Sequence, residues 1–268
     1  MQNREKYYLT LCLFLTIHIA CGQKLSLIKS FDFPSIHIVS IDVNSSFYVA
    51  DQQGNIFKFD STGRELNVYS PQRPSEITLL DASKTMNIFV FSRDLQQFRI
   101  LNRFLSSPSY TEIDRDYIGY AYMAGPSLDN NLWIFDNSAF SLKKYDITLQ
   151  NVTIEAPLDL ILDTEAYNIT QITEYQNKVY LNNVQSGILV FDNLGNHGAA
   201  LPFKTNYFNF LNDEIYFIEE GELIFYNLYS RETRKISSGE IEKAKYALAF
   251  NRKVLLFTEE RISIFQLH

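Results

Sequence analysis

The sequence has few cysteine and histidine residues, and their positions exclude much chemistry. Its two cysteines, Cys12 and Cys21, both lie near the start of the 268-residue chain. The rest of the chain therefore has no disulfide and no thiol nucleophile, and must be held by its core alone. No G-x-S-x-G motif occurs either. Nothing in the sequence marks a site of nucleophilic catalysis.

Clustered positive charge is also absent. The chain has 24 Lys and Arg against 31 Asp and Glu, a net charge of −7, and the basic residues are dispersed. Binding to phosphate backbones or to anionic lipids needs Lys and Arg gathered on one surface. We therefore expect no nucleic-acid partner, and contact with a membrane only through a lipid anchor.

One apolar run stands at the N-terminus, over residues 7–20, after Arg4 and Lys6. It is too short to span a bilayer comfortably, because a transmembrane helix needs roughly 20 apolar residues. A basic start, a short apolar stretch and small residues before a cleavage site are typical of a secretory signal peptide. The sequence predicts a signal peptide over residues 1–22 and an exported domain over residues 23–268.

Two ways of processing this segment remain open. Cleavage after Gly22 would release a soluble protein from Gln23 onward, since Ala20 and Gly22 give a small-x-small pattern. Alternatively, Cys21 is acylated and tethers a lipoprotein to a membrane. His18 stands where that second signal normally has a leucine-like residue. Both alternatives predict a bacterial protein of the periplasm or the outer membrane, or one that is secreted.

What the sequence does have is aromatic strands: 17 Tyr and 21 Phe. A short aromatic or β-branched run, a polar turn and a second alternating run recur six times. The second runs begin at residues 56, 97, 142, 188, 223 and 263, which gives a mean spacing of about 41 residues. A period of this length with four strands per unit is typical of a β-propeller. Inner strands that would precede the six hairpins lie at 36–41, 76–80, 120–124, 169–173, 207–211 and 246–250.

The sixth unit determines how the ring closes. The chain ends at His268, directly after the third strand of this unit, so a fourth strand is missing there. Residues 24–33 form a spare strand at the other end. An unpaired strand would expose a row of backbone donors and acceptors. The sequence therefore predicts an all-β, six-bladed β-propeller whose N-terminal strand closes the last blade.

The first unit resembles a known repeat family. The matching residues are Asp42, Tyr48-Val49-Ala50-Asp51, Phe57-Lys58-Phe59-Asp60 and Gly63. They resemble the NHL repeat and related repeats of six-bladed propellers, and residues 129–136 repeat part of the pattern. The other units keep only its hydrophobic rhythm. The resemblance implies the fold. Some of the propellers it points to are lactonases with calcium in the central channel, which implies an alternative function.

Several polar residues near the inner strands are candidates for lining the channel. His37 is the one plausible functional imidazole, because His197 falls in a predicted turn and His268 is the terminus. Calcium needs six or more oxygen ligands, and these candidates do not recur at matching positions of the repeat. We therefore expect no cofactor, with calcium as the alternative. The channel candidates are His37, Glu76, Asn168, Asn209 and Asn251.

A polar residue closes the third strand of four units, at Asp60, Asp146, Asp192 and Asn227. Its side chain can accept backbone N–H bonds in the following turn. These four residues are predicted to be structural.

Two long connections, at residues 106–115 and 154–166, are where binding surfaces tend to lie on a rigid scaffold. Tyr110, Tyr117, Tyr120 and Tyr122 lie in or near the first. Aromatic residues are favoured interface anchors, although packing between blades would account for them equally well.

The sequence favours a non-catalytic, monomeric propeller that binds or scaffolds a protein partner in the cell envelope. The alternatives are a calcium-dependent propeller hydrolase such as a lactonase, or a propeller that binds carbohydrate or another small ligand. Oxygen ligands converging on the axis would favour the hydrolase. Exposed aromatic residues on one face would favour the small-ligand protein.

Overall fold

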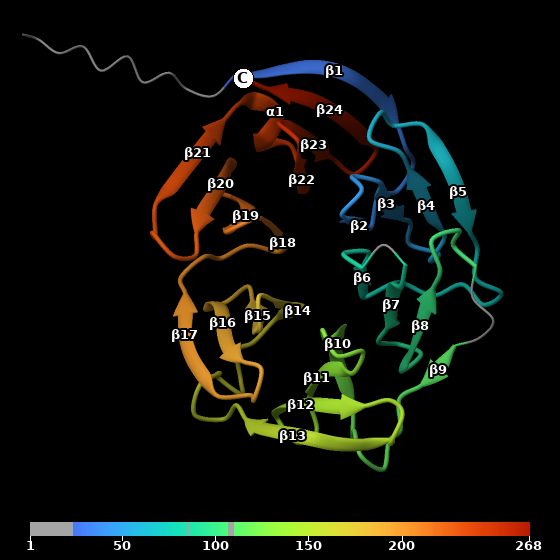
Figure 1. The fold of residues 1–268 in the computed structure, drawn as a ribbon, viewed down its shortest axis with the longest axis vertical. Coiled ribbons are helices and arrows are strands. Elements are labelled where there is room, and N and C mark those ends of the chain that lie inside the picture. Colours follow the sequence, from blue (N-terminus) through green and yellow to red (C-terminus); the bar gives the residue numbers. More distant parts are fainter. Residues whose placement is uncertain (1–23, 85, 107–109) are drawn as a thin grey trace, which may run out of the picture.

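The computed structural model describes residues 24–84, 86–106 and 110–268, and it consists almost entirely of six four-stranded antiparallel sheets arranged in a ring (Figure 1). The fold is a six-bladed β-propeller, as the repeat predicted. Blades one and two comprise β2 (Ile38–Ile41), β3 (Phe47–Ala50), β4 (Ile56–Phe59), β5 (Glu65–Tyr69), β6 (Leu79–Asp81), β7 (Ile88–Ser92), β8 (Gln97–Leu101) and β9 (Thr111–Glu112). Blades three and four comprise β10 (Ala121–Pro126), β11 (Leu132–Asp136), β12 (Ser141–Asp146), β13 (Asn151–Pro157), β14 (Ile169–Tyr175), β15 (Lys178–Asn183), β16 (Gly187–Asp192) and β17 (His197–Leu201). Blades five and six comprise β18 (Phe208–Leu211), β19 (Glu214–Glu219), β20 (Glu222–Asn227), β21 (Thr233–Ser237), β22 (Tyr246–Phe250), β23 (Lys253–Phe257), β24 (Arg261–Leu267) and β1 (Leu25–Asp32).

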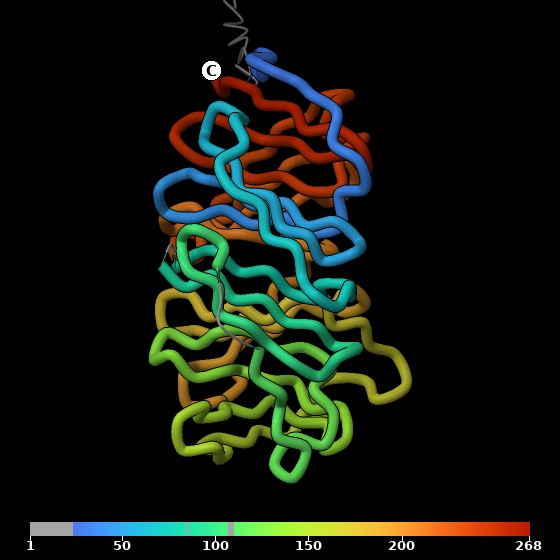
Figure 2. Tube along the Cα trace, turned by 90° about the vertical axis from the view of Figure 1, so that its right-hand side faces the viewer, coloured from blue at the N-terminus to red at the C-terminus, as the bar shows by residue number. Residues whose placement is uncertain are grey.

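The N-terminal strand closes the last blade. The strand order of this sheet is β1-β24-β23-β22, and β1 pairs with β24 from Leu25 opposite Leu267 to Asp32 opposite Arg261. The two strands, drawn in blue and red, lie side by side in both views (Figures 1 and 2). The prediction that the two ends of the chain share one sheet is confirmed.

The same segment also contacts blade one. The ring of Phe33 packs edge-on against that of Phe57, with 4.9 Å between ring centroids. The Lys29 ammonium donates a hydrogen bond to the carbonyl oxygen of Gly63 at 2.9 Å. The segment therefore joins blade six to blade one as well as completing a sheet.

Burial explains which strands were easy to recognise. The middle strands are covered by a neighbouring blade on each side, so every residue of β7 and β11 is buried. Such strands read as continuous apolar runs. The outer strand β13 alternates between exposed and half-buried residues, and β17 is almost wholly exposed. His197, predicted to lie in a turn, is the first residue of β17 and pairs with Phe191.

Polar side chains bond neighbouring blades to one another. The amide of Gln96 both accepts from the N–H and donates to the carbonyl of Ala121, at 2.9 Å each. Gln171 does the same with Phe208 of the next blade, at 3.1 and 3.0 Å. These buried amides satisfy backbone groups at the start of an inner strand, where no strand partner is available. They fix the angle between adjacent blades.

Blades three and four approach each other at Gly125. A Cβ added there would lie 2.5 Å from the carbonyl oxygen of Ile172. Only glycine permits this distance between two inner strands. Blade three therefore lies close against blade four at this position.

A single helical turn, α1 (Gly239–Glu242), was not predicted; Ser238 caps it and it buries Ile241. Within the described residues, no helix has the length and apolar character needed to cross a membrane.

Candidate functional site

A cavity of about 380 Å³ lies where the inner strands run into the turns that follow them. We call this end of the ring, which carries the turns between first and second and between third and fourth strands, the bottom face; the opposite end is the top face. Five blades contribute to the cavity, and blade three, drawn in at Gly125, does not. The polar and aromatic residues that line the cavity include Ser45, Asp42, Asp81, Ser83, Thr173, Glu174, Tyr175, Tyr207, Asn209, Phe210, Asn212 and Asn251.

The charge of this cavity is of one sign. Asp42, Asp81 and Glu174 line it, and its described lining includes no Lys, Arg or His. The nearby Lys84 ammonium is held by the carbonyl oxygen of Ser127 at 2.6 Å. The cavity is therefore an acidic pocket on the axis of the ring.

Aromatic residues separate the cavity from the top face. Tyr207 lines the cavity, and its ring packs edge-on against Tyr246 with 5.3 Å between centroids. The hydroxyl of Tyr246 donates to the backbone carbonyl of His37. Burial, and after it the nearby Tyr216 and Asp81, raise the pKa of Tyr207 well above its usual value. The Tyr207 hydroxyl is thus a neutral hydrogen-bonding group at any physiological pH.

The residues predicted to line the channel lie at different ends of the ring. Asn209 and Asn251 line the cavity. His37 and Glu76 meet at the start of the inner strands, with 3.2 Å between Nε2 and Oε1, and the same Nε2 lies 3.0 Å from the carbonyl oxygen of Ile77. Asn168 donates its backbone N–H to the Asn183 side chain at 2.8 Å and accepts the N–H of Val184 at 3.0 Å, and it does not line the cavity.

These five candidates do not come together at one place: Asn209 and Asn251 line the cavity, whereas His37 and Glu76 meet elsewhere. Over the described ranges, no three His, Cys, Asp or Glu side chains are grouped so that they could hold a metal ion. Cys21 and the predicted signal peptide lie outside the described residues.

The four tyrosines proposed as an interface do not form one patch. Tyr117 and Tyr120 are exposed in the connection before β10, on the top face. Tyr122 is half-buried and packs edge-on against Phe135 of the same blade, with 5.8 Å between centroids. Tyr110 is exposed at the edge of blade two.

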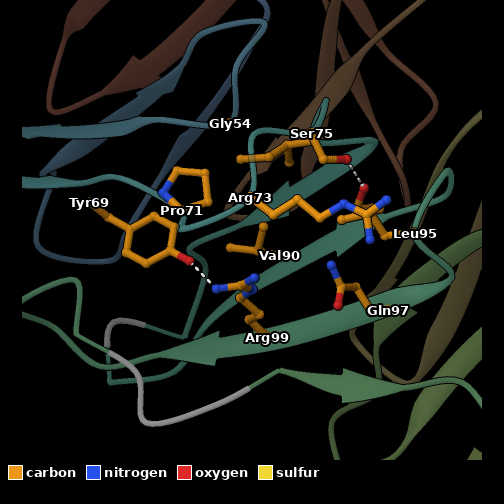
Figure 3. A pocket seen from close by; sticks show the side chains of 11 residues that line it. Gly54, Tyr69, Pro71, Arg73, Ser75, Val90, Leu95, Gln97 and Arg99 are labelled. Atoms are coloured by element: carbon orange, nitrogen blue, oxygen red, sulfur yellow. Dashed lines mark hydrogen bonds between the residues drawn. The ribbon is translucent and has the colours of Figure 1, made fainter.

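Tyr69, Arg73 and Arg99 line a groove between blades one and two (Figure 3). Tyr110 lines an adjoining open depression of about 650 Å³ that shares these three residues. Arg99 donates to the Tyr69 hydroxyl there, and its guanidinium also lies 5.5 Å from the centre of the Tyr110 ring. The groove in Figure 3 encloses about 30 Å³, which suits a water molecule.

Several turns of the bottom face share the same capping hydrogen bond. The predicted caps are confirmed: Asp60, Asp146, Asp192 and Asn227 each accept the backbone N–H of the residue two positions on, at 2.8–2.9 Å. Because the cap fixes the turn, the side chain near its tip is turned to solvent. Several of these side chains are apolar.

Apolar side chains consequently gather on the bottom face, a set that sequence reasoning missed. The exposed apolar residues in its turns are Val43, Met86, Phe104, Leu128, Leu149, Leu194 and Tyr229. They come from five blades, and Val43 also lines the cavity. Among the described residues, the top-face loops expose Tyr117, Tyr120 and Leu160, all from the two loops that flank blade three. For all of these bottom-face residues except Met86, a large side chain one to three positions after a capping Asp, Asn or Ser was the sequence pattern that could have predicted them.

These observations define a six-bladed β-propeller with an acidic axial cavity and an apolar bottom face. No protein-family model and no curated protein matches the sequence. Solved structures do match. A streptogramin B lyase aligns over 90% of this chain and 98% of its own, with a TM-score of 0.63 and 14% identity. Virginiamycin B lyase from Staphylococcus aureus aligns over 91% and 100%, with a TM-score of 0.62 and 11% identity. BamB from Moraxella catarrhalis aligns over 91% and 100%, with a TM-score of 0.51 and 10% identity. At these identities the likeness establishes the fold alone.

Proposed function

We propose that this propeller is an exported, non-catalytic module that binds a protein partner of the cell envelope on its bottom face. The observation that carries the proposal is the set of exposed apolar side chains in the bottom-face turns of five blades. Apolar side chains gathered on one surface mark protein-interaction sites in soluble proteins. The top face offers no comparable set among the described loops. The predicted signal peptide supports a place outside the cytoplasm.

The rigidity of the ring supports this reading. Each tip side chain is held by a capped turn on a blade that is bonded to the next by buried polar groups. A partner therefore meets a preformed surface and loses little binding free energy to ordering it. Turns on a rigid scaffold are a common place for recognition.

The test is partner recovery from detergent-solubilised envelope. The variant Leu149→Ser/Leu194→Ser/Tyr229→Ser is expected to recover the partner at least about tenfold less than the unsubstituted protein. The three side chains are 66–70% exposed, so the variant should fold normally. The matched control is Tyr117→Ser/Leu160→Ser on the top face, which should recover the partner fully. Equal recovery by both variants, or no stoichiometric partner at all, argues against the proposal.

A lyase or hydrolase is the second candidate, and the pair of His37 and Glu76 on the axis favours it. A carboxylate beside an imidazole is a common arrangement for moving a proton. One similar structure is a catalytically inactive histidine-to-alanine variant of virginiamycin B lyase bound to quinupristin. Conversion of quinupristin by this protein, abolished by His37→Ala, would establish an enzyme. Quinupristin of unchanged mass after incubation would argue against this lyase activity.

A further inference from the structure

The axial cavity has the size and lining of a ligand site in its own right. At about 380 Å³ it falls within the range of small-molecule sites. Carboxylates, amides and aromatic rings converge on it, and no described lining residue carries positive charge. An anion would be repelled from such a pocket, whereas a cation would be drawn into it.

The three lining carboxylates differ in how far the protein itself satisfies them. Asp42 accepts the N–H groups of Asn44 and Ser46 and the hydroxyl of Tyr48, so both of its oxygens are occupied. This carboxylate organises its own turn. It is not available to a ligand.

In Asp81 and in Glu174, one carboxylate oxygen accepts hydrogen bonds from the protein and the other does not. Oδ1 of Asp81 accepts from the N–H of Ser83 at 2.8 Å. Oε2 of Glu174 accepts from the N–H of Leu128 and from the indole of Trp133, at 3.0 and 2.8 Å. Oδ2 of Asp81 and Oε1 of Glu174 accept no hydrogen bond from the part of the chain that the structure describes. These contacts hold both carboxylates in place and leave one oxygen of each able to accept a hydrogen bond from a ligand.

Aromatic rings complete the lining. Tyr175 and Phe210 stack with 4.2 Å between centroids, and Tyr207 presents a neutral hydroxyl. Ring faces attract organic cations and also bury an alkyl chain. The lining thus combines negative charge with apolar surface, which suits a cation that carries a hydrocarbon tail better than a bare metal ion.

We propose that the axial cavity binds an alkylammonium or alkylguanidinium group, with Asp81 and Glu174 as its counter-charges. The group can belong to a free amine or be the side chain of a Lys or Arg; the chemistry recognised is the same. The inference stands apart from the proposed protein partner, because the residues that carry it line the cavity and differ from the exposed tips.

The test uses n-butylguanidinium as the probe and n-butylurea as its neutral isostere, titrated by calorimetry against the full protein. The guanidinium is expected to bind at least about tenfold more tightly than the urea, because charge-assisted hydrogen bonds are the stronger kind. Asp81→Asn and Glu174→Gln keep the shape and the internal hydrogen bonds but remove the charge. Each should weaken guanidinium binding about tenfold and leave urea binding unchanged. The control Asp60→Asn removes a half-buried charge outside the cavity and should change neither.

Three results would overturn the proposal: equal affinity for the two probes, no guanidinium binding at millimolar concentration, or binding that both cavity variants leave unchanged. A tripeptide amide, acetyl-Leu-Arg-Leu, distinguishes the sources of the group. Tighter binding of the peptide than of the free probe indicates a partner side chain, and weaker binding indicates a free amine. The Leu149→Ser/Leu194→Ser/Tyr229→Ser variant separates the two proposals, because it should lose the partner and still bind the probe.

Discussion

Replacing Asp136 by asparagine is expected to cost about 3–5 kcal/mol of folding free energy, the largest effect of any single polar substitution in this protein. Asp136 is 1% exposed and accepts a hydrogen bond from the ammonium of Lys143, itself 7% exposed, at 2.9 Å. It also accepts the backbone N–H groups of Gly119 and Tyr120 at 3.1 Å each. Asparagine would leave the Lys143 charge buried without its main counter-charge.

The contribution of Asp136 to folding stability depends on pH, and the pKa of this residue gives the direction of that dependence. Burial by itself would raise the pKa of Asp136, but the Lys143 ammonium and the backbone N–H groups outweigh it and hold this pKa below the ordinary 3.8. A carboxyl with a lowered pKa contributes stability that is complete above the ordinary pKa and is lost as the pH falls through the folded-state value. The native protein should therefore lose this contribution only below about pH 4. The Asp136→Asn variant should lack it at neutral pH.

Thermal and urea unfolding between pH 3 and pH 7 provide the measurement. Asp192→Asn is the matched control, since Asp192 also ends a strand and accepts a backbone N–H but is only half-buried and has no Lys partner. The double variant Asp136→Asn/Lys143→Met should recover much of the stability, because it removes both charges together and keeps an amide oxygen as acceptor for the backbone N–H groups. If the Asp136→Asn variant has the same melting temperature as the Asp192→Asn variant, the buried pair of Asp136 and Lys143 does not stabilise the fold as argued.

Deleting residues 24–33 is the second change with a large expected effect. It removes β1, exposes the whole of β24 as an unpaired edge, and takes away Phe33, which is buried against blade one. Loss of a buried Phe side chain alone costs about 3–5 kcal/mol. An apolar edge strand also invites pairing between molecules. We expect the shortened protein to aggregate or to unfold near room temperature.

Size-exclusion chromatography and thermal unfolding test this expectation. A protein that begins at Gln23 retains β1 and should behave as a stable monomer. An independent check is the variant Ser30→Cys/Ser263→Cys, since the two hydroxyls face each other across the strands at 2.9 Å. A disulfide between these positions, found by peptide mapping, requires the paired strands. A shortened protein as stable as the longer one would contradict the role given to β1.

Much of the fold was readable because burial and sequence agree in the middle strands. The run from Leu132 to Asp136 is covered on both sides, so its residues are almost all apolar and the repeat is visible there. The outer strands face solvent, and so β17, which begins at His197, carried no such pattern. The capping residues were also predictable, because an Asp or Asn at the end of a strand acts on its own turn.

The candidate site was less predictable, because its residues are far apart in the sequence. Asn209 and Asn251 were identified from their place at inner-strand ends, but Asp81 and Glu174 were not. Which end of an inner strand faces a cavity depends on how the blades tilt and close, and Gly125 alters that closure locally. The apolar bottom face was missed for the same reason, since its turns are about 40 residues apart.

The sequence by itself determined the six-fold repeat, the strand that joins the two ends and the lack of thiol chemistry, because period, strand pattern and composition are local properties of a chain. Only the tertiary structure decided that Asp81 and Glu174 share an acidic cavity, that His37 meets Glu76 at the other end of the channel, and that apolar tips gather on one face. These are properties of the closed ring: it brings together side chains that no spacing along the sequence relates.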